Sequence, residues 1–344
     1  MGNPMPVVVN RGIGCLKRIS LVCLLVALQC QPARSEERIL DFGIIMMQSS
    51  LVERWRPLAD DLGTVLGNPV KIKVFNDYAG AVWAMGANRI QIAWLGNKTA
   101  IEAVDRASGE VLCRTVDADG EDMYAAQLIT NVNSDLNSME DVLARAATIT
   151  FRHGDPNSTS GFLLPYYYLF SRNGIDPRTI FKRVTRGSHE ENFLAVADGC
   201  ADAATGNSVS MKQFKILFPE KFQAIKVIWS SPAVCSDPIV VRKTLPTSIK
   251  QRTFDFFTRY GRPADGKTAE RLEHERAVLA NLLYSGFVAS SDLQLIPIRL
   301  IELQQLKIRL QGDEALSRGE QEIRVKEVDE RIQKIESQQT KGAY

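Results

Sequence analysis

Three consecutive hydroxyl-bearing residues, Ser158, Thr159 and Ser160, are the side chains best suited to chemistry in this sequence. They belong to the loop 154–162, which follows an expected strand and opens an expected helix. Hydroxyls and backbone N–H groups at the start of a helix suit a phosphate-like oxyanion, because they combine neutral donors with the positive end of the helix dipole. Alternatively, Ser158 or Thr159 serves only as the helix cap. The loop therefore indicates either an oxyanion site or an ordinary capped helix.

The sequence shows no second pattern that indicates catalysis or a metal site. No Lys follows the glycine of the loop, so a nucleotide-hydrolysing phosphate loop is not expected. There is no Ser-His-Asp elbow and no Cys/His cluster with zinc spacing, and the Glu190-Glu191 pair is interpreted as a solvated helix face. The sequence thus predicts that the protein is not an enzyme and needs no cofactor or metal.

Alternating strands and helices surround the loop. A β-α-β-α-β pattern covers residues 40–95, which predicts a parallel sheet covered by helices. The pattern restarts after Asn131, so we expect two α/β lobes, with hinges near Asn131 and Asp237 and a ligand cleft between the lobes. Further strands are expected at 147–151, 203–205, 226–230 and 237–242, and helices at 189–197, 248–260 and 268–283. The expected lobes are 36–131 with 238–300 (lobe 1) and 132–237 (lobe 2).

Seven stretches spread over the chain resemble, in the same order, the periplasmic phosphonate-binding proteins of ABC importers. They are residues 77–80, 92–97, 102–107, 154–162, 189–190, 236–240 and 290–295. The resemblance implies an α/β fold of two hinged lobes that close on a ligand, each lobe a mixed sheet covered by helices. It also implies a periplasmic solute-binding protein that works with an ABC permease and its ATPase.

The resemblance carries ligand contacts onto named residues of this chain. The implied oxyanion contacts are Tyr78, Ser158, Thr159, Ser160 and His189. His189 would donate to the anion and add charge if protonated; otherwise it is a helix-face histidine with a water partner. Asp237 matches a carboxylate that faces the ammonium group in relatives that bind aminoalkyl phosphonates; otherwise it is a turn former before Pro238.

Two positions depart from the relatives that bind aminophosphonates. Leu95 stands where they are expected to have Tyr, and Val209 where they have Glu. Both changes remove polar partners of an ammonium group, so we expect a more apolar substituent end that prefers a short alkyl phosphonate or phosphite to 2-aminoethylphosphonate. Gln48 or Ser210 could supply a replacement partner. The remaining alternatives are a binder of another small oxyanion and a sensory ligand-binding module.

The N-terminal 35 residues resemble a secretory signal. Arg11, Lys17 and Arg18 precede the apolar run 19–28, and small residues at positions 33 and 35 suggest cleavage after Ser35 and a periplasmic location. An uncleaved anchor is the alternative, although the run is shorter than the roughly 20 residues of a spanning helix; a lipid on Cys30 is another. The full chain has 42 basic and 40 acidic side chains, four of the basic ones within residues 1–35. The mature chain is then slightly acidic, which argues against nucleic-acid binding.

Two features remain open at the level of sequence. Cys113, Cys200 and Cys235 stay in the mature chain; Cys200 and Cys235 are the pair to test for a disulfide, and three free thiols are the alternative. From Ile301 to residue 344 the chain reads as a charged amphipathic helix with apolar residues at 325, 328, 332 and 335. This C-terminal helical extension packs on its own domain or forms a homodimer.

Overall fold

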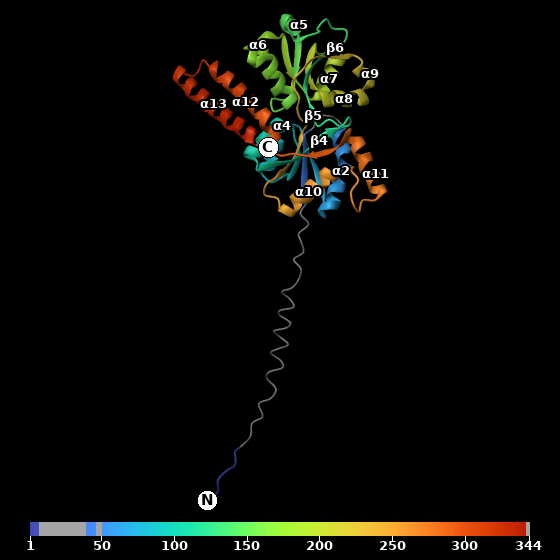
Figure 1. Ribbon diagram of the computed structural model, residues 1–344, viewed down its shortest axis with the longest axis vertical. Helices are drawn as coiled ribbons and strands as arrows, with labels where there is room; N and C mark the ends of the chain where they lie inside the picture. Colours follow the sequence, from blue (N-terminus) through green and yellow to red (C-terminus); the bar gives the residue numbers. More distant parts are fainter. Residues whose placement is uncertain (7–38, 46–49, 342–344) are drawn as a thin grey trace. The chain divides into compact units, whose positions relative to one another are not determined.

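The computed structural model describes residues 1–6, 39–45 and 50–341, with side chains up to residue 337. Residues from Ile39 onward form one compact unit built around two large sheets (Figure 1). The predicted cleavage site at Ser35, the basic residues before it and Gln48 lie outside the described residues. Within the described part of the chain, no helix is both long enough and apolar enough to span a membrane.

The first sheet has six strands in the order β13-β4-β12-β3-β1-β2. β1 pairs in parallel with β2 and β3, whereas β12 is antiparallel to β3 and β4, and β13 is antiparallel to β4. The predicted parallel unit is therefore confirmed as one part of a mixed sheet. The strands are β1 (Leu40–Ile45), β2 (Val70–Phe75), β3 (Ile92–Trp94), β4 (Gly109–Asp117), β12 (Pro238–Arg242) and β13 (Tyr284–Ala289).

Helices cover both faces of this sheet. Trp55, Phe257 and Leu279 bury one face beneath α2, α10 and α11, and Ala81 and Ala103 lie in the cluster beneath α3 and α4 on the other. These helices are α2 (Leu51–Leu66), α3 (Tyr78–Gly86), α4 (Asn97–Arg106), α10 (Thr247–Arg259) and α11 (Ala269–Leu282). Gly67 ends α2 in the left-handed conformation at φ 67°, where a side chain would be strained. The local stop signal in the sequence thus works as expected.

The second sheet has five strands in the order β10-β6-β9-β7-β8 and carries helices on both faces. Its strands are β6 (Ala126–Asn131), β7 (Thr150–His153), β8 (Arg183–Arg186), β9 (Ala203–Asn207) and β10 (Ile225–Ser230). Its helices are α5 (Met139–Ala144), η1 (Ala146–Thr148), η2 (Thr159–Leu163), η3 (Tyr166–Phe170), η4 (Ser171–Asn173), α6 (Pro177–Ile180), α7 (His189–Ala197), α8 (Ser208–Leu217) and α9 (Pro219–Phe222).

One strand prediction was wrong in its first half. Residues 146–148 form a 3₁₀ turn, closed by the hydrogen bonds from Thr148 N to Arg145 O and from Ile149 N to Ala146 O. The strand β7 begins only at Thr150, whose N–H donates to the Asp202 carboxylate at 2.7 Å. Local turn hydrogen bonds therefore override the β-branched composition of residues 147–151.

The chain passes between the sheets around a short pair of strands, β5 (Met123–Tyr124) and β11 (Val234–Cys235). Asn131 ends β6 inside the five-stranded sheet, so the first crossing comes before it rather than at Asn131. The second crossing leads through β11 to Asp237, directly before β12. The division into two lobes remains a prediction, although the expected boundary at Asn131 would separate β6 from the other strands of its sheet.

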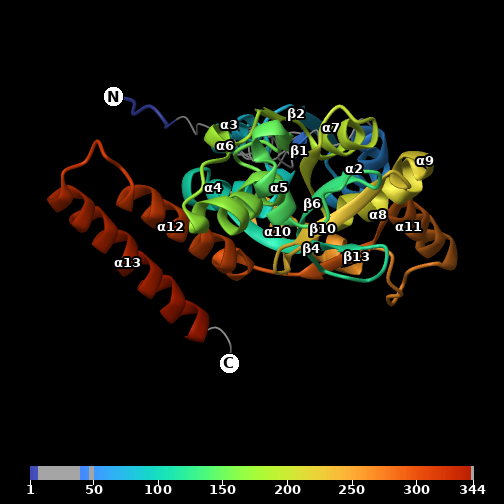
Figure 2. The ribbon, with the colours of Figure 1, turned by 90° about the horizontal axis from the view of Figure 1, so that it is seen from above.

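The C-terminal region forms a helical hairpin rather than a single extension from Ile301. After the 3₁₀ turn η5 (Asp292–Leu295), α12 (Ile296–Gln311) packs against α13 (Arg318–Lys341) (Figure 2). Val328 and Ile332 of the predicted apolar stripe are buried against Leu303 of α12. Most of the stripe is thus covered by the chain itself.

All three cysteines of the described chain carry free thiols. Cys113 is buried, Cys235 is partly buried and Cys200 is exposed. The structure therefore agrees with free thiols and contains no Cys200–Cys235 disulfide.

Candidate functional site

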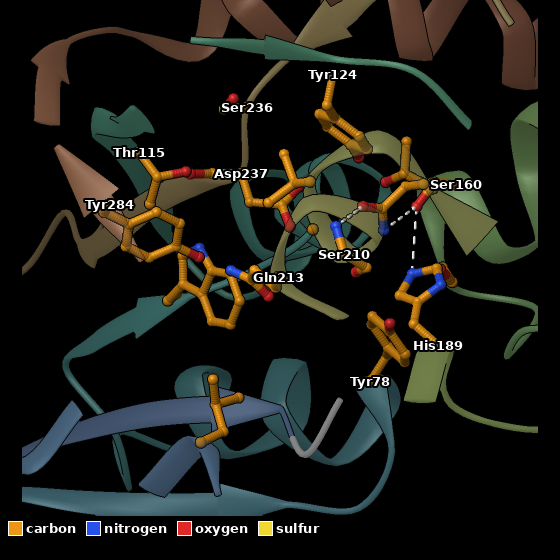
Figure 3. A pocket seen from close by; sticks show the side chains of 17 residues that line it. Tyr78, Thr115, Tyr124, Ser160, His189, Ser210, Gln213, Ser236, Asp237 and Tyr284 are labelled. Carbon is orange, nitrogen blue, oxygen red and sulfur yellow. Dashed lines mark hydrogen bonds between the residues drawn. The ribbon is translucent and has the colours of Figure 1, made fainter. Parts of the chain in front are cut away.

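A cavity of about 40 Å³ lies where elements of the two large sheets meet. A cavity of this size suits a small ligand. Figure 3 shows the side chains that line it. They are Leu51, Tyr78, Trp94, Gly96, Thr115, Tyr124, Ser158, Thr159, Ser160, His189, Asn207, Val209, Ser210, Gln213, Ser236, Asp237 and Tyr284. All six predicted ligand contacts line this cavity, although they come from segments far apart in the sequence.

The hydroxyl loop is held in shape by two glycines. Gly154 N donates to Gly161 O at 2.8 Å, and a Cβ on Gly154 would lie 2.7 Å from the Gly161 Cα. Ser158 caps the following helix, accepting a hydrogen bond from Gly161 N at 3.0 Å. The helix opens with a π-helical turn, a form that often occurs at functional sites. The two interpretations of the loop are thus compatible, since Ser158 both caps the helix and lines the cavity.

Hydrogen bonds from protein N–H groups determine whether the three hydroxyls can donate to a ligand. The oxygens of Ser158, Thr159 and Ser160 each face a donor: Gly161 N at 3.0 Å, Lys98 N at 2.8 Å and Asn207 Nδ2 at 3.3 Å. A hydroxyl has one proton and two lone pairs, so an oxygen that accepts from the protein keeps its own proton to donate. The loop is therefore arranged to present hydroxyl protons to an acceptor in the cavity.

His189 lies beside this loop as the first residue of α7. Ser188 and Glu191 form a capping box that fixes the start of the helix. The imidazole Nε2 is 3.3 Å from Ser160 Oγ, and Nδ1 has no partner among the described residues. Burial lowers the pKa of His189 to about 4, so the ring is neutral at neutral pH when the cavity is empty. The expectation that a protonated His189 supplies charge is therefore not met by the ligand-free protein.

Tyr78 and Tyr124 add two further phenols. Tyr78 begins α3, whose cap is the Asp77 carboxylate that accepts from Gly80 N at 2.7 Å. Burial raises the pKa of both tyrosines well above the ordinary value, so both phenols keep their protons and can donate. Tyr124, on the short strand β5, was not identified from the sequence, because nothing local marks it as a site residue.

Asp237 is the one carboxylate that lines the cavity. Its Oδ1 is buried and has no hydrogen-bond partner among the described residues. Burial raises the pKa of Asp237 to about 7, although the hydrogen bond from Tyr124 acts in the opposite direction. The side chain points into the cavity in Figure 3 rather than closing a turn before Pro238.

Among the described residues, no lysine or arginine lines the cavity. An anion bound here would be held by hydroxyls, phenols, an amide and a neutral imidazole. Such donors act strongly in a buried site, because little water is present to compete with them.

The structure corrects the expectation about the substituent end of the site. Leu95 is packed in the core, 1% exposed, and does not line the cavity, whereas Val209 and Ser210 do. The end away from the hydroxyl loop is lined by Thr115, Gln213 and Tyr284 (Figure 3). The cavity that was expected to have an apolar substituent end thus combines these polar side chains with the apolar residues Leu51, Trp94 and Val209.

Several lining residues had a detectable but unused signal in the sequence. Gly96 comes shortly after the end of β3, and Asn207 is the last residue of β9. Ligand sites in α/β sheets gather at such carboxyl ends of strands. Thr115, Gln213 and Tyr284 had no such signal. They belong to β4, α8 and β13, elements whose existence the sequence did not reveal.

Comparisons with known proteins identify the family of this chain. The model of a family described as the periplasmic substrate-binding protein of phosphonate ABC transporters matches residues 42–295. The chain is 44% identical to the phosphonates-binding periplasmic protein of Escherichia coli K12, over 85% of this chain and 84% of that protein. It is 25% identical, over 61% of this chain and 71% of the relative, to a probable phosphite-binding protein of Prochlorococcus marinus.

Solved structures show the same fold. A binding protein component of a phosphonate ABC transporter from Pseudomonas aeruginosa superposes with a TM-score of 0.82 at 41% identity, covering 90% of this chain and all (100%) of that one. A Prochlorococcus marinus protein in complex with methylphosphonate gives a TM-score of 0.67 at 19% identity, covering 78% of this chain and 100% of that one, which shows the fold alone. This chain belongs to the family of periplasmic substrate-binding proteins of phosphonate ABC transporters.

Proposed function

We propose that this protein captures a phosphonate, or a closely related small phosphorus oxyanion, in the described cavity and delivers it to an ABC permease with its ATPase. The observation that carries the proposal is the loop Ser158 to Ser160. Its hydroxyl oxygens already face protein N–H groups, and the hydroxyls line a buried cavity at the start of a helix. Three oxygens on one phosphorus atom match this row of donors.

The contacts proposed for the oxyanion are Tyr78, Ser158, Thr159, Ser160 and His189, with Asp237 and Val209 facing the substituent. Each lines the cavity. Burial lowers the pKa of His189 to about 4, whereas an oxyanion beside the ring would raise it again. Leu95 is no longer part of the proposed site.

Other small oxyanions remain as a second candidate ligand class. The hydroxyl loop alone does not distinguish a phosphonate from phosphite, and one curated relative is named as a probable phosphite-binding protein. A sensory role would use the same cavity with a different partner. Binding without turnover of the phosphonate supports transport or sensing and excludes an enzyme, whereas release of a product in the same mixture would contradict the proposal.

The location and assembly of the protein complete the proposal. Residues 1–35 act as a signal peptide that is cleaved near Ser35, so the mature protein is periplasmic. The two sheets belong to lobes that close on the ligand, with lobe boundaries near the crossings around β5 and β11. Homodimerisation through the C-terminal hairpin is retained as a proposal, supported by Ile323 of α13, which is 62% exposed. Sedimentation of the mature protein tests the dimer, and scattering with saturating ligand tests closure.

A calorimetric screen tests the central point. The mature protein is titrated with methylphosphonate, phosphite, phosphate and methanesulfonate, first as wild type and then as Ser158→Ala. The matched control is Ser138→Ala, which removes a helix cap of the same kind at α5, away from the cavity. Both variants lose a cap worth about 1 kcal/mol of stability, but only Ser158→Ala loses a donor to the anion, worth about 1–3 kcal/mol of binding. Equal affinities in the two folded variants would overturn the assignment.

A further inference from the structure

The cavity contains buried polar atoms that the oxyanion does not account for. Trp94 Nε1, Ser236 Oγ and Asp237 Oδ1 are buried and have no hydrogen-bond partner among the described residues. All three residues line the cavity, and Trp94 and Ser236 are only 6% and 3% exposed. Buried polar groups in folded proteins nearly always have a partner. Three orphan atoms in one cavity therefore point to a polar ligand group beyond the phosphorus end.

Of these atoms, Asp237 Oδ1 lies within reach of the oxyanion donors. A methyl group on Gly96 would lie 3.5 Å from Thr159 Oγ1 and 4.0 Å from Asp237 Oδ1, so one short molecule can touch both. In Figure 3, Asp237 lies between Ser160 and His189 on one side and Thr115 and Tyr284 on the other. A ligand whose phosphorus end contacts the hydroxyl loop therefore directs its substituent past Asp237.

The types of the orphan atoms restrict the substituent. The indole N–H of Trp94 can only donate. Asp237 accepts when it is ionised and can also donate when it is protonated, and the Ser236 hydroxyl can do both. A methyl or ethyl group would leave all three without a partner. An ammonium group can only donate, so it would leave the indole N–H unsatisfied and would place a donor against a donor. A hydroxyl group both donates and accepts, so it can bond to Asp237 and to Trp94 at once.

We propose that the preferred ligand is a phosphonate whose short carbon substituent ends in a hydroxyl group. This inference rests on the proposed function, because it assumes that the phosphonate group occupies the hydroxyl loop. The carbon stem has two aliphatic residues of the lining to pack on, Leu51 and Val209. The terminal hydroxyl donates to Asp237 and accepts from Trp94, with Ser236 as a further partner. The polar lining of this end is thus a specificity determinant.

Competition calorimetry with three ligands of nearly equal size tests the inference. The ligands are 2-hydroxyethylphosphonate, ethylphosphonate and 2-aminoethylphosphonate, titrated into the full mature protein. We expect the hydroxyethyl ligand to bind at least tenfold more tightly than either of the others. Ethylphosphonate or 2-aminoethylphosphonate binding as tightly as the hydroxyethyl ligand would overturn the inference while leaving the proposed function intact. Failure of every phosphonate to bind would overturn the proposed function as well.

Two tryptophan variants separate recognition from packing. Trp94→Phe removes the buried indole N–H of a residue that lines the cavity. Trp55→Phe removes the indole N–H of the neighbouring ring, which is also buried and unpartnered among the described residues. The two ring centroids are 5.2 Å apart, but Trp55 does not line the cavity. Trp94→Phe should reduce the preference for the hydroxyethyl over the ethyl ligand to threefold or less, and Trp55→Phe should leave it unchanged. An unchanged preference in Trp94→Phe, or an equal loss in both, would contradict the assignment of Trp94.

Discussion

Replacing Asp237 with Asn is expected to stabilise the ligand-free protein near neutral pH and to have little effect in acid. The Asp237 carboxyl is buried in the cavity, and its Oδ1 accepts no hydrogen bond from the described residues. Burial therefore raises its pKa from 3.8 to about 7, against the smaller effect of the hydrogen bond from Tyr124. The folded chain then keeps a proton that the unfolded chain has already released.

The size of the effect follows from the two pKa values. Each pKa unit corresponds to about 1.4 kcal/mol, so a shift from 3.8 to about 7 corresponds to about 4 kcal/mol. Below the unfolded pKa the group is protonated in both states and does not oppose folding. As the pH rises toward the folded pKa, the native state binds more protons than the unfolded state, so stability falls. Above the folded pKa the loss is complete, and Asn avoids it because it does not ionise.

Urea unfolding of the ligand-free protein at about pH 4 and about pH 8 measures this difference. Asp237→Asn should match wild type at the lower pH and exceed it by up to about 4 kcal/mol at the higher pH. Asp265→Asn, at an exposed position, is the control and should show no such divergence. A gain that is the same at both pH values, or no gain at either, would refute the argument from burial.

Other residues at the cavity and its rim give three further tests. Lys212→Met should weaken every ligand by a similar factor, roughly two- to tenfold, mainly through faster dissociation in stopped-flow traces. The reason is that Lys212 of α8 forms ion pairs with Asp117, Asp119 and Glu121 at 2.6, 2.9 and 2.9 Å. These ion pairs join α8 to β4 and the turn after it, and both elements line the cavity. A change for one ligand only would contradict this. His189→Gln should lower affinity by about 1 kcal/mol without changing its pH profile between about pH 6 and 8, because the ring is already neutral; diverging calorimetric profiles would show a charged ring. Gly96→Ala should fold normally but lose ligand, because its methyl group would occupy the space between Thr159 and Asp237; calorimetry showing wild-type affinity would place the ligand elsewhere.

Local signals in the sequence located many of the elements correctly. Such signals act over only a few residues. They include the apolar run 40–45, which forms β1, the glycine after Leu66, which ends α2, and the acidic residues at the start of α7. β4 escaped detection because Glu110, Arg114 and Asp117 interrupt its apolar residues, although the strand lies inside the six-stranded sheet. Neighbouring strands, which the sequence does not specify locally, decide its conformation.

Only the part of the site that is contiguous in the sequence was predictable. Ser158 to Ser160 form one unbroken motif, so their role was visible before the fold was known. Tyr124, Gln213 and Tyr284 reach the cavity from three separate elements, and only the tertiary arrangement brings them together. The error at Leu95 has the same origin: it lies next to lining residues Trp94 and Gly96, yet its side chain points into the core.

The lack of lysine and arginine in the cavity wall has a consequence for how the protein works among other ions. A cavity with fixed positive charge would attract chloride and sulfate whenever it is empty, and its ligand would have to displace them. Here attraction depends on the number and direction of donors, so an ion with too few acceptor atoms gains little on entering. Affinity should also change little with ionic strength, since screening acts mainly on exposed charges. A periplasmic protein built this way keeps the same discrimination when the salinity outside the cell changes.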